Sequence, residues 1–114
     1  MLAKVNRIVD AAGFRRVMRN GRKITTPHLV LYVAPPAGAS PQVGFVVSGK
    51  YGNAVARNTV RRRLRARVGD LVRSGLLNSD LVIRVKADAG TPDWADLGAE
   101  LQEITAHGES RSYV

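Results

Sequence analysis

The sequence predicts an α+β domain that combines three helices with four strands. Segments with apolar residues at helical spacing alternate with runs rich in β-branched residues, in the order α, β, β, β, α, β, α. The chain has 114 residues, 45% of them hydrophobic, which is enough for one core but short for two domains. We therefore expect a single domain over residues 1–114.

The first half of the chain is expected to contain one helix and three strands. Asp10 can cap a helix that ends at Asn20-Gly21. A short edge strand is expected over residues 22–26, and two longer strands over 28–34 and 42–48. Because only a proline-rich loop joins the two longer strands, we predict that they pair with each other as antiparallel neighbours.

The second half continues with a helix, a strand and a helix. Asn53 is a suitable N-cap for a helix that runs to about Arg73. A strand follows over residues 80–87, and Thr91-Pro92-Asp93 predicts the start of the last helix, with Thr91 as its cap. Residues 108–114 are expected to form a polar tail. The apolar stripe of the first of these helices comprises Val60, Leu64, Val68, Leu71 and Val72, and that of the second comprises Trp94, Leu97, Leu101 and Ile104.

The charge is strongly positive and unevenly distributed. The net charge is +9, and 14 of the 18 basic residues are arginine, whose planar guanidinium suits phosphate. Residues 1–67 hold 14 basic residues and one acid, whereas residues 68–114 hold 4 basic residues and 8 acids. We therefore expect an anionic partner that binds the N-terminal half.

Composition also narrows the compartment and the possible sites. The absence of cysteine excludes disulfides, thiolate zinc sites and a thiol nucleophile. The uncharged segment 24–49 is interrupted by prolines and is too broken to span a membrane, and the N-terminus lacks the apolar run of a signal peptide. We expect a cytoplasmic protein without membrane contact.

The densest feature is the predicted helix after Asn53, where residues 57–67 contain six arginines and no acid. Like charges at this spacing repel one another, so solubility alone does not explain them. Unpaired N–H groups at the helix start, and close backbone approach at Gly52, also favour phosphates. The pattern predicts nucleic-acid binding without distinguishing DNA from RNA. At about 100° per residue, one flank of the helix collects Asn58, Arg61, Arg62 and Arg65.

No catalytic or metal-binding residues are expected. The only histidines, His28 and His107, lie far apart in the sequence, and such residues are mostly structural or solvent-exposed. The last helix carries acids at helical spacing, which we interpret as a solvated face opposite its apolar stripe. These acids are Asp93, Asp96, Glu100 and Glu103.

Residues 48–65 read Ser-Gly-Lys-Tyr-Gly-Asn-Ala-Val-Ala-Arg-Asn-Thr-Val-Arg-Arg-Arg-Leu-Arg. This segment resembles the signature of the bacterial ribonuclease P protein subunit, which runs roughly Ser-Lys-Lys-x-Gly-x-Ala-Val-x-Arg-Asn-Arg-x-Lys-Arg-x-x-Arg. The resemblance extends over most of the chain, including residues 6–8, 14–21, 29–32 and 80–85. Gly49 and Thr59 stand where the family is basic, and we expect Arg63 and Arg67 to compensate for them.

The resemblance implies a two-layer sandwich: a four-stranded mixed sheet packed by three helices, with the Arg-rich helix crossing between parallel strands in a left-handed sense. Physical rules alone favour the right-handed sense. It also implies a non-catalytic subunit of ribonuclease P, which binds the catalytic RNA in a 1:1 complex and helps it remove the 5′ leader from precursor tRNA. Mg²⁺ would be used by the RNA. By the same resemblance, the residues that face the catalytic RNA are Lys50, Asn53, Arg57, Asn58, Arg61, Arg62 and Arg65.

A second surface is implied on the first helix and the sheet, namely a cleft for the single-stranded leader. Unstacked bases gain roughly 1–3 kcal/mol each by stacking on aromatic side chains. For Phe14 and Met18, ordinary core packing at i, i+4 stays open as an alternative. The matching cleft residues are Phe14, Met18, Val30 and Tyr32, and a basic rim along the leader's phosphates would comprise Arg15, Arg16, Arg19, Arg22 and Lys23.

Two other functions remain open from the sequence. A structural RNA-binding protein of the ribosome shares the small size, the basicity and the mixed fold, but it needs no substrate cleft with Phe14 and Tyr32. A DNA-binding regulator usually needs a dimer interface, for which the sequence shows no apolar signal. A strand rather than a helix precedes Asn53, which also argues against a helix-turn-helix.

Overall fold

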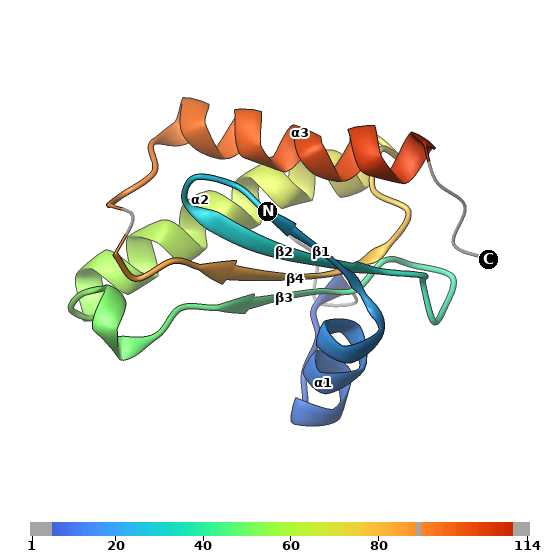
Figure 1. The fold of residues 1–114 in the computed structure, drawn as a ribbon, viewed down its shortest axis with the longest axis horizontal. Coiled ribbons are helices and arrows are strands. Elements are labelled where there is room, and N and C mark those ends of the chain that lie inside the picture. The colour runs from blue at the N-terminus through green and yellow to red at the C-terminus, as the bar shows by residue number, and fades with distance from the viewer. Residues whose placement is uncertain (1–5, 89, 111–114) are drawn as a thin grey trace.

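A computed structural model describes residues 6–88 and 90–110, with side chains described as far as residue 104. Figure 1 shows a four-stranded sheet with helices on both of its faces. The helices are α1 (Ala11–Asn20), α2 (Ala54–Arg73) and α3 (Trp94–Ser110), with a short 3-10 turn, η2 (Gly49–Tyr51), before α2. The strands are β1 (Arg22–Thr25), β2 (Leu29–Ala34), β3 (Val43–Val46) and β4 (Asp80–Val85). The predicted α+β class and element order are confirmed.

The strands lie side by side in the order β1-β2-β4-β3. β1 pairs with β2 and β2 with β4 in the antiparallel sense, whereas β3 and β4 are parallel. The predicted pairing of β2 with β3 is therefore wrong, because β4 lies between them. Five of the six β4 residues are buried, and a strand that is apolar on both faces is stable at the centre of a sheet rather than at its edge.

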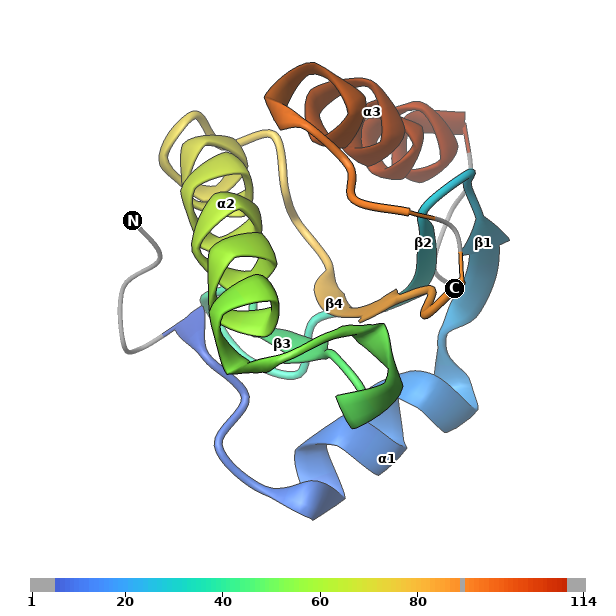
Figure 2. The same cartoon turned by 90° about the vertical axis from the view of Figure 1, so that its left-hand side faces the viewer.

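The connection from β3 through α2 to β4 is left-handed. When α2 is in front of the sheet and both strands point up, β4 lies to the left of β3, as Figures 1 and 2 together show. This is the sense implied by the family resemblance and the opposite of the general rule for such crossovers. It places α2 above the edge strand β3, where one flank of the helix is left open.

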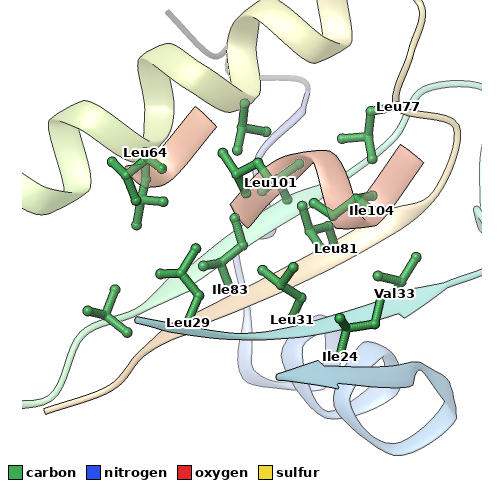
Figure 3. Close-up of a cluster of buried hydrophobic side chains, with 14 of the residues drawn as sticks. Ile24, Leu29, Leu31, Val33, Leu64, Leu77, Leu81, Ile83, Leu101 and Ile104 are labelled. Atoms are coloured by element: carbon green, nitrogen blue, oxygen red, sulfur yellow. The ribbon is translucent and has the colours of Figure 1, made fainter. Parts of the chain in front are cut away.

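Two clusters of buried side chains hold the helices to the sheet. The larger cluster joins the sheet to α2 and α3, with Leu31, Ile83 and Leu64 among its members (Figure 3). The smaller cluster, Val17, Ala34 and Val82, packs α1 against the opposite face. Figure 2 shows α1 on one face of the sheet and α2 and α3 on the other. The main core thus has the two expected layers, and α1 adds a partial third layer.

The sequence predicts two of the three helix starts correctly. Asp10 Oδ1 accepts a hydrogen bond from Gly13 N at 2.8 Å, and Asn53 Oδ1 accepts one from Ala56 N at 2.9 Å. α3 begins two residues later than expected, because Asp93 rather than Thr91 caps it, by accepting from the backbone N of Asp96 at 2.7 Å.

The end of α3 also differs from the prediction. The helix continues to Ser110, so residues 108–110 are helical and not part of a tail. Residues 111–114 of that predicted tail, and the side chain of His107, lie outside the described residues.

Glu100 corrects the prediction of a solvated acidic face on α3. The residue is only 6% exposed, and its Oε1 accepts from Thr26 Oγ1 at 2.5 Å and from His28 N at 2.7 Å. Its Oε2 lies 2.7 Å from His28 Nδ1. Burial by itself would raise the pKa of Glu100, but these hydrogen bonds outweigh it and hold the pKa below its ordinary value. His28 is therefore structural, as expected, and fastens the β1–β2 turn to α3.

Candidate nucleic-acid interface

The arginines of α2 divide between two sides of the helix. On the α3 side, Arg63 Nη1 donates to the carbonyl of Pro92 at 3.2 Å, and Arg67 Nη2 donates to the carbonyl of Trp94 at 2.8 Å. The guanidinium of Arg67 also lies 4.1 Å from the centroid of the Trp94 ring, which is 45% exposed rather than buried as predicted. These two arginines join α2 to α3, and their expected compensation for Gly49 and Thr59 stays a prediction.

On the other flank, three arginines have no protein partner. Within the described part of the chain, Arg61, Arg62 and Arg65 make no hydrogen bond and no ion pair. All three lie on the flank that the helical spacing predicts. A guanidinium has five donors, so this flank offers a dense set of unsatisfied charged donors to an external polyanion.

The turn before α2 extends this flank. Tyr51 packs against the main core and anchors η2, which leaves Lys50 exposed. Arg57 Nη1 donates to the carbonyl of Gly52 at 2.6 Å, so its guanidinium is held over the turn with other donors available. Asn53 uses its Oδ1 for the cap and retains its amide NH₂ group. Asn58, one turn further on, is exposed.

Thr59 carries no charge to the surface. Its Oγ1 donates to the carbonyl of Val55 at 2.8 Å, inside the helix itself. The position that is basic in the family signature therefore contributes only a small, internally bonded hydroxyl group. The next charged residue of the flank is Arg61, two residues later along the helix.

A small cleft of about 160 Å³ connects this flank to the first helix. Arg61 and Arg65 line it from α2, Phe14 lines it from α1, and Gly44 and Phe45 lie between them on β3. The ring of Phe14 lies directly over Gly44, since a Cβ there would come 2.4 Å from Phe14 Cε1. The two surfaces predicted from the sequence thus meet across the edge strand.

The other predicted cleft residues differ in accessibility. Tyr32 is partly exposed and, like Phe14, packs against the smaller cluster, and Met18 is 36% exposed on α1. Val30 is only 3% exposed, so it lies in the floor of this face and offers almost no surface. Ordinary core packing, the alternative kept open for Met18, does not describe its position.

The predicted basic rim is only partly placed for binding. Arg16 forms an ion pair with the buried carboxylate of Asp80, so it is a structural residue. Arg22 lies opposite Val33 of the main core, on the wrong face of the sheet, whereas Lys23 lies opposite Tyr32 and is exposed. Arg15 and Arg19 are exposed on α1.

Sequence reasoning missed Gly44 and Phe45 as cleft residues. Their strand reads only as a short apolar run, which does not reveal that its outer face meets α1 and α2. Sequence reasoning also missed Arg7 and Ile8. Arg7 forms a parallel β-bridge with Val43, and Ile8 N donates to the carbonyl of Val43 at 2.9 Å, which brings this segment to the rim of the cleft.

Other features of the described residues add no competing site. A larger groove of about 420 Å³ lies between α2 and α3, but the arginine that lines it, Arg67, is occupied by the carbonyl of Trp94. No three His, Asp or Glu side chains gather where they could hold a metal ion in the described ranges. Among the helices described, none combines the length and the apolar character needed to cross a membrane.

Comparisons with known proteins agree on one family. A profile of the Ribonuclease P family matches residues 2–108. The ribonuclease P protein component of Clavibacter michiganensis is 40% identical over 102 residues, which cover 89% of this chain and 90% of that protein. The corresponding protein of Kocuria rhizophila is 37% identical, over 93% of this chain and 94% of that protein.

Solved structures show the same fold. An RNase P protein mutant of Staphylococcus aureus superimposes with a TM-score of 0.80 at 24% identity, over 93% of this chain and 90% of that one. The RNase P protein of Thermotoga maritima gives a TM-score of 0.67 at 20% identity, over 82% and 89% of the two chains. The chain therefore belongs to the bacterial ribonuclease P protein family, whose members are the protein subunits of an RNA-containing holoenzyme that processes tRNA.

Proposed function

We propose that the protein binds the ribonuclease P RNA through α2 and binds the 5′ leader of precursor tRNA through the α1 face of the sheet. In this way it assists the RNA in removing the leader. Family membership favours this function over the ribosomal and DNA-binding alternatives. The observation that carries the proposal is the pairing of two surfaces across β3, a flank of unpartnered arginines and an aromatic cleft.

The RNA-binding part rests on charge without internal compensation. Three neighbouring arginines on one flank, without a partner among the described residues, would be costly to keep together unless an external anion neutralises them. Phosphates of a folded RNA satisfy both their charge and their donors. The proposed contact residues are Lys50, Asn53, Arg57, Asn58, Arg61, Arg62 and Arg65.

The leader-binding part rests on accessible aromatic rings beside this charge. Phe14 and Tyr32 belong to the α1-side cluster and keep part of their surface accessible. Bases of a single strand can stack on such rings without sequence preference, which suits leaders of varied sequence. Met18 widens the apolar surface, and Val30 supports it from below.

The chemistry of cleavage is assigned to the RNA. The described residues contain no cluster of carboxylates or histidines that fits a catalytic Mg²⁺ ion. In this proposal Mg²⁺ is held by RNA phosphates, and the protein, in a 1:1 complex, supplies affinity and orientation. The arginine flank lowers the repulsion between the two RNA molecules, so less Mg²⁺ is needed.

The test is reconstitution with a ribonuclease P RNA at low Mg²⁺ concentration. We expect the protein to restore cleavage of precursor tRNA at the mature 5′ end, under conditions in which the RNA alone is inactive. Absence of stimulation, with the protein shown to be folded, would overturn the proposal.

A further inference from the structure

Arg84 is the one charged side chain on the α1 face of the central strand β4 besides the buried Asp80. Along β4, Leu81, Ile83 and Val85 point into the main core, so Val82 and Arg84 point to the face that carries α1. Arg84 lies opposite Val30 on β2 and Val46 on β3. It is the one residue of β4 that is not buried.

The guanidinium of Arg84 has no partner in the described protein. It makes no hydrogen bond and no ion pair there, and its nitrogen atoms are not among the buried unpaired ones, so they reach solvent. The carboxylate on the same face, that of Asp80, lies four residues away, roughly 13 Å along the strand, and is bonded to Arg16. No protein group among the described residues therefore competes with a phosphate for the Arg84 guanidinium.

The position of Arg84 relative to the aromatic rings is what a leader phosphate requires. Tyr32 and Gly44 lie opposite Val82, and the ring of Phe14 covers Gly44. Arg84 is the next residue of β4 on this face, roughly 7 Å further along the strand. A strand whose bases stack on these rings therefore carries its backbone toward a solvated guanidinium.

We propose that Arg84 binds a backbone phosphate of the precursor tRNA leader and is a specificity residue for precursor over mature tRNA. The proposal rests on the leader cleft of the proposed function and adds a contact that the family signature does not include. The guanidinium can donate two parallel hydrogen bonds to one phosphate, which a lysine cannot. The contact is with the backbone, so it is independent of leader sequence.

The experiment measures equilibrium binding of the reconstituted holoenzyme to precursor and mature tRNA. We expect Arg84→Gln to weaken binding of the precursor by about fivefold and to leave mature tRNA unchanged. The salt dependence of precursor binding should lose about 0.7 in slope, the value for one single-strand phosphate. Arg84→Lys should keep the slope and lose part of the affinity. Arg73→Gln, which removes the same charge from the far end of α2, should match the wild type.

A methylphosphonate scan of the leader identifies the phosphate. A methylphosphonate at one leader position should weaken binding to the wild-type holoenzyme but should not further weaken binding to the Arg84→Gln holoenzyme. The reason is that the methylphosphonate and the substitution remove the same contact. Equal loss for precursor and mature tRNA, or unchanged precursor binding by Arg84→Gln, would overturn the assignment. Failure of the proposed leader cleft itself would look different, since the wild-type holoenzyme would then not prefer precursor over mature tRNA. Thermal unfolding of each variant confirms that it is folded.

Discussion

At the scale of single residues, the function of each arginine depends on its partner rather than on its position in the charge pattern. Arg16 has a buried carboxylate, and Arg63 and Arg67 have carbonyl groups at the start of α3. Arg61 and Arg65 have no partner in the part of the chain that the structure describes. The sequence predicts the open flank because helical spacing is regular. It does not predict the partners, because these come from segments about 30 to 60 residues away.

The same limit explains the two largest errors at this scale. Glu100 follows the spacing of a solvated face, but the β1–β2 turn, which is remote in sequence, covers it and supplies three hydrogen bonds. Trp94 follows the apolar stripe, but it lies in the first turn of α3, beyond the edge of the core, and stacks on Arg67 instead.

Gly44 is expected to control the position of Phe14. In Gly44→Ala the new Cβ would come 2.4 Å from Phe14 Cε1, so the ring must leave its place in the cleft. We expect precursor tRNA affinity to fall by about fivefold, which corresponds to about one lost stacking contact, with mature tRNA affinity unchanged. Equilibrium binding measures this, and Gly38→Ala is the matched control, since a Cβ there meets nothing within 4 Å. If Gly44→Ala bound precursor tRNA with wild-type affinity, stacking of a leader base on Phe14 would be contradicted.

Tyr32 provides a second test of the cleft. Tyr32→Ala should weaken precursor binding by about 1 kcal/mol or more, because it removes a stacking surface, and should not affect mature tRNA. Tyr32→Phe keeps the ring and should retain most of the affinity. If the two variants behave alike, or if mature tRNA is affected equally, base stacking on Tyr32 is disproved.

We predict that Glu100 makes a pH-dependent contribution to the stability of the folded protein. The pKa of Glu100 is lowered in the folded protein, so its contribution is complete above the ordinary value of 4.5 and is lost as the pH falls through the lower folded value. We therefore expect Glu100→Gln to lower the melting temperature at neutral pH, with a difference that shrinks below about pH 4.5. Thermal unfolding across pH measures this, with Asp88→Asn, at an exposed position, as the control. A difference that does not change with pH would contradict the role of the ionised form.

At the scale of elements, α2 has two charged sides with different roles. Arg61→Ala with Arg65→Ala should weaken binding to the ribonuclease P RNA and reduce its salt slope by roughly 1 for each lost phosphate contact. Arg63→Ala with Arg67→Ala removes the same charge from the same helix, but should mainly lower stability, by about 1 kcal/mol or more, through loss of the contacts to α3. Salt-dependent binding and thermal unfolding distinguish the two. Equal slopes for both double variants would show that only net charge matters.

Element boundaries could largely be predicted, whereas their pairing could not. Asp10 and Asn53 fix two helix starts through local hydrogen bonds, which depend on adjacent residues only. The loop between β2 and β3 favours their pairing with each other. The insertion of β4 between them depends instead on covering both apolar faces of β4 with other elements, which is a property of the whole sheet.

At the scale of the whole molecule, the high net positive charge lowers the stability of the free protein. The excess of positive charge in residues 1–67 repels itself in the free protein. We expect added salt to raise the melting temperature of the free protein, because it screens this repulsion, and to lower that of the RNA complex, because it weakens phosphate contacts. Thermal unfolding at low and high salt, with and without the RNA, measures both. Parallel changes in the two samples would contradict this account.

The left-handed crossover is the feature of the whole molecule that physical rules on the sequence mispredict. Those rules favour the right-handed sense, and only the family resemblance of residues 48–65 indicated the other. The sense matters for the site, because it sets α2 over β3, next to Phe14 of α1. The meeting of the two surfaces therefore depends on topology and could not be read from either motif alone.

The strand order also has a consequence for synthesis of the chain. β4 is one of the two interior strands, yet it is the last strand to leave the ribosome, so neither β3 nor the β1–β2 hairpin has β4 as its neighbour until residues 80–85 have emerged. The arginine helix is made before the sheet that supports it. A nascent chain that stops short of β4 thus presents the basic segment without its supporting sheet, and the arginine flank takes its place beside β3 only after β4 has been made.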